Sequence, residues 1–401
     1  MDGREARIPG DDEHRALTPF EYAEQVRLEE QRRAIGDGGE TSAPPTRGQV
    51  LAWLGHHTST LRRIAAQQGA DDVDAVVKHY IDLLSSVDTP NPFDEPGTRA
   101  ILAQLMGWCH DALVHAQIEL PTPSFGVLFT PDVNAQGSLT VGGVPLVLVN
   151  QPLFAFCNAI SKLFLTTAFF RSSGRPHEAQ LDTARVASAI ESHPELLFEL
   201  TMAIGMYAAI GQYQRSLSFG TDNHVLVRLR YDLLVAMEMF VVGHEIGHTL
   251  AQESRARAAA GEASSEDIAD AHREEFQADL VAATIAAVHG RNNDIVFMRT
   301  GVGGSLALAW LDIVARARAV IATGHVTEYL SATHPSLEDR LERFGVTIDE
   351  ALSEEKREGA RLLRVECLKA TELMWAQMLP YFEALHREGV RPIPGLSVPL
   401  H

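Results

Sequence analysis

Apolar residues recur at helical spacing along most of this chain, and one short region breaks the pattern. Apolar positions three and four residues apart mark one face of an amphipathic helix, and glycine and proline separate the segments that have them. The pattern predicts a mainly helical protein. We expect helices over residues 48–68, 72–87, 96–117, 152–171, 180–191, 195–217, 226–252, 265–289, 301–322, 335–344 and 350–387.

Residues 121–150 differ, because β-rich runs replace the helical spacing there. Turn residues between such runs predict two or three antiparallel strands. Pro145, near the start of the last run, favours an edge position for that strand, since proline cannot donate a hydrogen bond to a neighbouring strand. We therefore predict an α+β fold that is mainly helical. The expected strands are 125–129, 138–141 and 144–149.

Composition along the chain suggests four regions. Residues 1–47 contain a polar, acidic tail, a charged helix over 18–34 and a linker rich in glycine and proline. We predict a helical N-terminal region over 48–120, a core over 121–345 and a helical C-terminal extension over 346–401.

The string His244-Glu245-Ile246-Gly247-His248 carries the clearest chemistry in the sequence. Apolar residues precede it at helical spacing, which places it on a mostly buried helix. Residues four apart lie on one face of a helix, so His244 and His248 can bind one metal ion. A zinc ion with one further protein ligand keeps a position for water and lowers the pKa of that water to about 7. The string therefore predicts a zinc hydrolase in which Glu245 is the general base.

A third metal ligand is expected on the helix over 265–289. Glu275 and Asp279 lie four apart and face the same way, so one can bind the metal while the other accepts the free N–H of a ligand histidine. Glu274 and His272 are the alternative ligands. Glu274 does not share its face with Asp279, and we therefore favour Glu275.

A third group of polar residues precedes and occupies the helix predicted over 335–344. Pro335 suits the first position of that helix, which places His334 at the cap with its side chain free. An imidazole N–H, or a phenol such as Tyr329, could stabilise the oxyanion that forms during hydrolysis. In the plainer alternative, His334 only caps the helix and Arg340 pairs with Glu338 or another acid.

Taken in order, these motifs resemble those of the gluzincin zinc metallopeptidases. The HEIGH string, the E-x-x-A-D string that begins at Glu275, and Ser331 to Pro335 followed by Arg340 are most similar to one family of gluzincins. That family includes the CAAX prenyl proteases and the membrane heat-shock proteases, and its minimal catalytic unit is called a minigluzincin. The resemblance covers roughly residues 200 to 345, which is about a third of the chain.

The resemblance implies a role for each residue and a fold for the core. A small sheet before the HExxH helix would bind an extended substrate along its edge strand, by main-chain hydrogen bonds. The implied zinc ligands are His244, His248 and Glu275, with Glu245 as general base, Asp279 orienting a ligand histidine, and His334 and Arg340 on the substrate-facing or supporting side.

The chain departs from that family in its hydropathy. The prenyl and heat-shock proteases are embedded in membranes, whereas Lys162, Glu238 and Asp312 interrupt the longest apolar stretches here before they reach the length of a membrane span. We expect no membrane span. Soluble HExxH proteases that cleave repressors therefore become a second comparison, although Thr333-His334-Pro335 favours the first family.

Composition adds three expectations. The start of the chain lacks the apolar segment of a secretory signal, and the three cysteines are widely separated, so we expect a cytoplasmic protein without a disulfide framework. The net charge of −19 argues against a nucleic-acid partner.

The sequence therefore predicts a soluble intracellular zinc metalloendopeptidase that binds one Zn²⁺ and cleaves a restricted set of protein substrates. Two alternatives stay open. The chain could be a zinc-stabilised binding or regulatory module without catalysis, or an effector protease of defence or stress responses with a single target. The sequence does not predict an oligomeric state.

Overall fold

A computed structural model describes most of the chain. Tyr329, the tail over 1–15 and most of the linker over 36–47 lie outside the described residues. The described residues are 17–36, 46–67, 72–86, 91, 93–167, 170–172, 179–181, 183–213, 224–251, 265–326 and 334–396.

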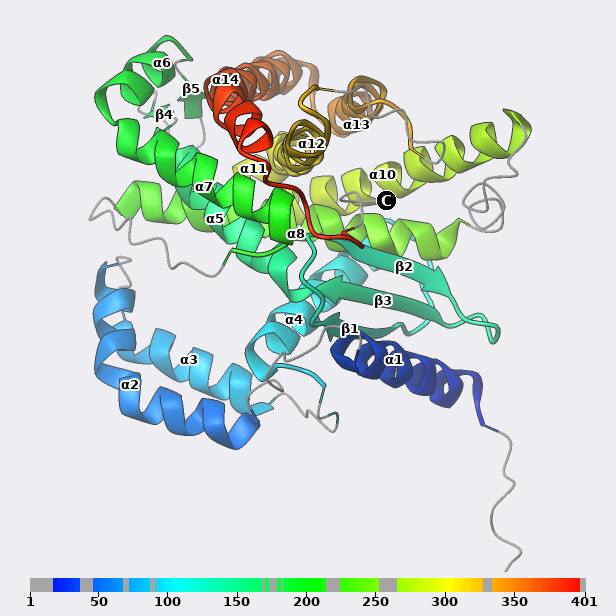
Figure 1. The fold of residues 1–401 in the computed structure, drawn as a ribbon. Coiled ribbons are helices and arrows are strands. Elements are labelled where there is room, and N and C mark those ends of the chain that lie inside the picture. Colours follow the sequence, from blue (N-terminus) through cyan, green and yellow to red (C-terminus); the bar gives the residue numbers. More distant parts are fainter. Residues whose placement is uncertain are drawn as a thin grey trace, which may run out of the picture.

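The fold is mainly helical with a small sheet, as the hydropathy pattern predicts (Figure 1). Most helices lie within a few residues of their expected positions. They are α1 (Pro19–Gly36), α2 (Arg47–Gln67), α3 (Val73–Ser86), α4 (Pro96–His115), α5 (Gln151–Thr167), α6 (Thr183–Ser192), α7 (Pro194–Ile210), α8 (His224–Leu250), α10 (Ser265–Asn292), α11 (Val296–Arg299), α12 (Val302–Thr323), α13 (Leu337–Glu350) and α14 (Glu354–Arg387).

The sheet differs from the antiparallel arrangement that the sequence suggested. It has three strands in the order β1-β3-β2, and β3 pairs in parallel with β1 and antiparallel with β2. A separate pair, β4 (Phe170–Ser172) and β5 (Ala179–Leu181), was not predicted. The strands of the main sheet are β1 (Ser124–Leu128), β2 (Ala135–Leu139) and β3 (Pro145–Asn150).

Pro145 does not mark an edge strand, because β3 lies in the centre of the sheet. Pro145 is the first residue of β3, and the pairing with β1 begins one residue later, between Ser124 and Leu146. The missing N–H therefore costs no ladder hydrogen bond at this position. The edge strand that adjoins the HExxH helix is β2.

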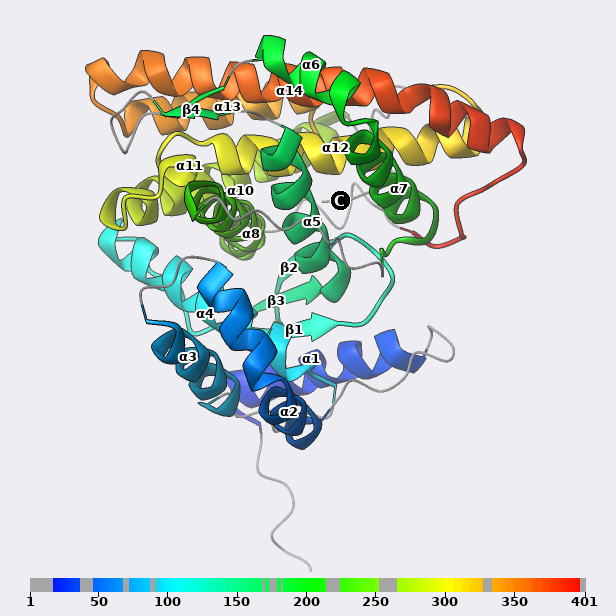
Figure 2. The same cartoon turned by 90° about the vertical axis from the view of Figure 1, so that its left-hand side faces the viewer.

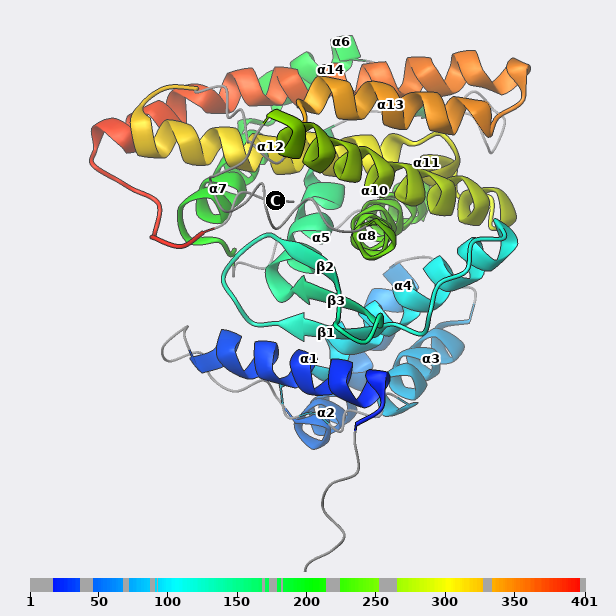
Figure 3. The same ribbon diagram turned by 90° about the vertical axis from the view of Figure 1, so that its right-hand side faces the viewer.

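The two faces of the sheet are covered by different helices. Leu146 and Leu148 of β3 pack with Ala34 and Val26 of α1. Val147 and Val149 of β3 point to the opposite face of the sheet and belong to the main core, where β2 and β3 contact α8. Alternate side chains of a strand point to opposite faces, so both faces of β3 are buried. Figure 3 shows α1 below the sheet and α8 with α10 above it.

Helix α1 is anchored through buried polar groups as well as apolar ones. The Arg27 guanidinium lies 3.2 Å from the carboxylate of Asp94, and both side chains are almost fully buried. The Gln31 amide donates to Asp94 at 2.6 Å and to the carbonyl of Val127 in β1 at 2.8 Å. Because buried polar groups are costly when they lack partners, this cluster fixes the position of α1 on the sheet.

Helix α8 lies at the centre of the fold, where α5, α10 and α12 pack around it, with α13 and α14 farther out against α12 (Figure 2). Its apolar residues Leu233, Met237 and Phe240 are fully buried. This confirms that the HExxH string lies on a buried helix. None of the described helices is long and apolar enough to cross a membrane.

Candidate metal centre

The last turns of α8 bring two histidines together in the interior. His244 and His248 are both buried, and their Nε2 atoms lie 2.9 Å apart. The spacing of four residues on one helix produces this contact, because such residues lie on the same helix face.

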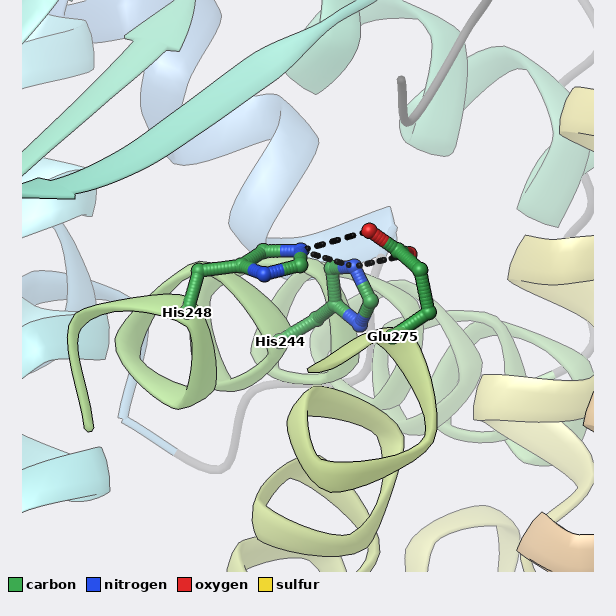
Figure 4. A group of neighbouring side chains, drawn as sticks. All are labelled: His244, His248 and Glu275. Atoms are coloured by element: carbon green, nitrogen blue, oxygen red, sulfur yellow. Dashed lines mark hydrogen bonds and ion pairs between the residues drawn. The ribbon is translucent and has the colours of Figure 1, made fainter. Parts of the chain in front are cut away.

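Glu275 of α10 faces both imidazoles from the neighbouring helix. Its carboxylate oxygens lie 3.4 Å from Nε2 of His244 and 3.3 Å from Nε2 of His248 (Figure 4). The close approach of the two helices depends on Gly247, because a Cβ at that position would lie 2.5 Å from Cα of Ala278 on α10. A glycine inside the motif therefore allows the third donor to reach the first two.

The three side chains form a group that could hold a metal ion, since their donor atoms all lie within 4.8 Å of one another. Zinc bonds of 2.0–2.1 Å in a tetrahedral site place neighbouring donor atoms about 3.3 to 3.4 Å apart. The two distances from Glu275 to the imidazoles match this spacing, and the 2.9 Å between the two imidazole nitrogens is a few tenths of an ångström shorter. The donor set of two imidazoles and one carboxylate also suits zinc. The residues therefore fit the predicted ion.

The structure also distinguishes among the acids and histidines that the sequence left open as third ligand. Within the described residues, the group contains Glu275 and neither Glu274 nor His272. Glu274 is also buried, so burial alone did not separate it from Glu275. The direction of the side chain separates them, because consecutive residues on a helix point about 100° apart.

Asp279 holds His244 from the side opposite the metal group. Its Oδ1 lies 3.0 Å from Nδ1 of His244, so Nε2 of the same ring is left to face Glu275. Burial alone would raise the pKa of Asp279, but the charge and hydrogen bonds of Arg340, together with His244, lower it to about 2. An ionised Asp279 fixes the tautomer of a ligand histidine, as carboxylates next to metal sites do.

Arg340 of α13 pairs with Asp279 and not with Glu338. Its Nε and Nη2 atoms donate to the two carboxylate oxygens of Asp279, each at 2.8 Å. Nη2 also lies 3.8 Å from Glu275. The guanidinium therefore supports both acidic residues of the centre from a third helix.

His334 lies inside the site, but it does not cap α13. Its Nε2 is 3.1 Å from Oε1 of Glu275, and the residue is buried. The cap is Ser336, whose hydroxyl accepts a hydrogen bond from the N–H of Asp339 at 3.1 Å. A serine hydroxyl accepts hydrogen bonds from the backbone N–H groups of a helix N-terminus better than an imidazole does. The helix therefore begins after Ser336 and not at Pro335. The imidazole of His334 instead turns toward Glu275.

Glu245 lies directly beneath the edge strand of the sheet. A Cβ at Gly137 of β2 would overlap the backbone carbonyl oxygen of Glu245. Glu245 itself is almost fully buried. Strand β2 thus passes over the general base predicted from the sequence, at a distance that only glycine permits.

The free edge of β2 offers backbone groups beside Glu245. Hydrogen bonds from Asn150 to Asn134 and from Thr140 to Val144, each at 3.0 Å, place the even-numbered residues of this strand in the bonded pairs with β3. Bonded and non-bonded pairs alternate in an antiparallel ladder, so the N–H and C=O groups of Ala135, Gly137 and Leu139 point away from β3. Within the described part of the chain, no other strand pairs with that edge.

Two residues near the centre were not recognised from the sequence as part of it. Gly137 stands in a strand, where glycine often marks the close approach of another backbone, and that signal could have identified it. In the sequence, Glu238 stands out only as a charge that interrupts an apolar stretch. It is 8% exposed on α8, which makes it a buried carboxyl group close to the motif.

In comparisons with known proteins, no family model, no curated protein and no solved structure matches this chain. The geometry of the site is therefore the basis for its function.

Proposed function

We propose that this chain is a zinc-dependent metallopeptidase with a minigluzincin-type core, and that it cleaves peptide bonds in a restricted set of protein substrates. One observation carries the proposal: two imidazoles and a carboxylate from two helices converge on one buried point, with a second carboxylate, Glu245, next to them in the chain. A structural zinc site has no need of that additional acid, whereas hydrolysis requires a base.

His244, His248 and Glu275 are the residues that would hold the ion. A bound zinc ion supplies a Lewis acid for the scissile carbonyl and lowers the pKa of water to about 7. Glu245 accepts the proton from the attacking water and returns it to the leaving amine. Asp279 keeps Nε2 of His244 directed at the ion, and Arg340 keeps Asp279 ionised.

Two residues are proposed to stabilise the oxyanion. His334 lies against Glu275, and this closeness to the proposed ligand group supports a role for its imidazole N–H as a donor to a substrate oxygen. Tyr329 keeps the role predicted from the sequence as an additional donor.

The edge of β2 is the proposed binding site for the substrate backbone. The outward-facing groups of Ala135, Gly137 and Leu139 can pair with an extended peptide, and Gly137 places that peptide beside Glu245. Main-chain pairing of this kind holds a peptide whatever its sequence, so the choice of substrate depends on side-chain pockets.

Replacing Glu245 with glutamine tests the proposal. We expect Glu245→Gln to bind as much zinc as the unaltered protein and to lose about 100-fold or more of its hydrolytic rate, since general-base catalysis contributes factors of that size. The measurement compares new peptide N-termini by mass spectrometry in cells expressing each protein, with zinc content measured on the purified samples.

The matched control is Glu274→Gln, which removes a buried acid next to Glu275 but outside the ligand group. It should retain both zinc and proteolytic fragments. Equal fragments from Glu245→Gln and the unaltered protein would remove Glu245 from the mechanism. A biological activity that survives the substitution, in the absence of any fragments, would favour a zinc-stabilised binding module.

A further inference from the structure

Glu238 is a buried acid that the proposed hydrolytic mechanism does not use. It lies on α8 with 8% of its surface exposed. No hydrogen bond or ion pair joins its carboxyl group to another residue in the part of the chain that the structure describes. A buried charge without a countercharge is costly, so such an acid is either protonated or balanced by a cation from outside the chain.

The position of Glu238 on the helix connects it with the catalytic residues. It precedes Glu245 by seven residues, which is close to two full turns, so the two side chains leave α8 in nearly the same direction. The separation along the helix axis is about 10 Å. Glu238 therefore lies on the same face of α8 as Glu245, the predicted general base beneath β2.

Among the described residues, no positive charge lies near enough to Glu238 to lower the pKa of its carboxyl group. Helix α5 packs along α8, and its Cys157 is near enough that the charge of Glu238, after burial, contributes to raising the pKa of the thiol. Burial raises the pKa of Glu238 itself to about 8. A cationic group brought next to this carboxylate would reverse that effect, since an opposite charge favours the ionised form.

We propose that Glu238 determines specificity by accepting the side chain of a lysine or arginine of the substrate, near the scissile bond. The inference rests on the proposed function, because it requires a peptide bound beside Glu245. Lysine and arginine carry their charge at the end of long, flexible side chains, which the separation of about 10 Å between Glu238 and Glu245 requires. The net charge of −19 adds a long-range attraction for basic substrates.

Short peptide hydroxamates that chelate zinc provide the test. In a series, lysine and the uncharged, similarly shaped norleucine are exchanged at each position in turn, and the dissociation constant of every compound is measured on the zinc-loaded protein. At one position, lysine should bind about tenfold more tightly than norleucine, which is what one charge-assisted hydrogen bond provides. In Glu238→Gln this ratio should fall to about one.

Two further variants make the result specific. Glu238→Asp keeps the charge and should retain part of the preference for lysine. Asp232→Asn changes another buried acid on α8, which pairs with Arg228 at 3.0 Å, and should leave the ratio unchanged. A loss of preference that followed simply from a disturbed helix would appear in Asp232→Asn as well.

The outcomes separate this inference from the proposed function. If the hydroxamates bind with no preference for lysine at any position, or if Glu238→Gln keeps the preference, the role of Glu238 is wrong while the zinc site stands. If the purified protein takes up no zinc and binds none of the compounds, the proposed function and this inference are both overturned.

Discussion

Replacing Arg340 with methionine is expected to destabilise the protein by about 3 to 5 kcal/mol and to weaken zinc binding, because the change removes the positive charge that balances the buried Asp279 carboxylate. The two side chains are 6% and 1% exposed and share two hydrogen bonds of 2.8 Å. Methionine fills much of the same space without the charge. The free energy of unfolding, measured by urea denaturation of the zinc-free protein, gives the first effect directly.

Zinc affinity gives the second effect of the same substitution. Asp279 orients His244, and residues that support metal ligands in this way contribute about 10-fold to 100-fold in affinity. A competition titration with a chromophoric chelator should therefore show a loss of that size in Arg340→Met.

Arg343→Met is the matched control, since it makes the same chemical change one helical turn later on α13. Arg343 stacks on the ring of Phe276 at 3.7 Å and does not reach the ligand group. Its loss should cost about 1 kcal/mol or less and leave zinc affinity unchanged. If Arg340→Met and Arg343→Met were equally stable and bound zinc equally well, the support assigned to Arg340 would be wrong.

Replacing Gly137 with alanine is expected to abolish most of the hydrolytic activity with a smaller effect on stability. The added Cβ would overlap the carbonyl oxygen of Glu245, so β2 and α8 must move apart. A displacement of about 1 Å at a catalytic group can reduce the rate by a factor of about 100. Overpacking of this kind costs about 1 to 3 kcal/mol. Fragment yield and thermal melting measure the two effects separately.

Gly107→Ala provides the comparison for Gly137→Ala. Gly107 lies on an exposed face of α4, and a Cβ there would meet nothing within 4 Å. Alanine should stabilise this helix by about 0.5 to 1 kcal/mol and leave hydrolysis unchanged. If Gly137→Ala melted and cleaved like Gly107→Ala, the close contact between β2 and Glu245 would not exist.

The local parts of the site could be predicted from the sequence. His244 and His248 share a helix face because of their spacing, and the same reasoning favoured Glu275 over Glu274. These inferences depend on the geometry of one helix at a time. The pairing of Arg340 with Asp279 was harder to predict, because it joins α13 to α10 and a sequence does not state which acids a helix meets.

The arrangement of the sheet could not be predicted in the same way. Composition identified the runs that became β1 and β3, but whether strands pair in parallel or antiparallel depends on contacts between distant segments. Strand β2 begins at Ala135, earlier than expected. Ala135 and Gly137 are poor strand formers, so the sequence did not mark them as part of a strand, but the neighbouring strand and α8 hold them in place.

Packing also extended a helix beyond its expected end. The helix was predicted to end at residue 344, yet α13 continues through Gly345 to Glu350. Phe344 and Ile348 are buried against Gly301 at the start of α12, and this contact outweighs the low helix propensity of a single glycine. The division of the chain at residues 48, 121 and 346, and the role of Tyr329, stay predictions.

Metal analysis of the purified, folded protein tests the central claim most directly. We predict about one zinc ion per chain in the unaltered protein and in Glu274→Gln, and less than a tenth of that amount in His248→Ala and in Glu275→Ala, because each of these loses one of three protein ligands. A folded protein that takes up no zinc, or a Glu275→Ala variant that keeps its full zinc content, would contradict the account.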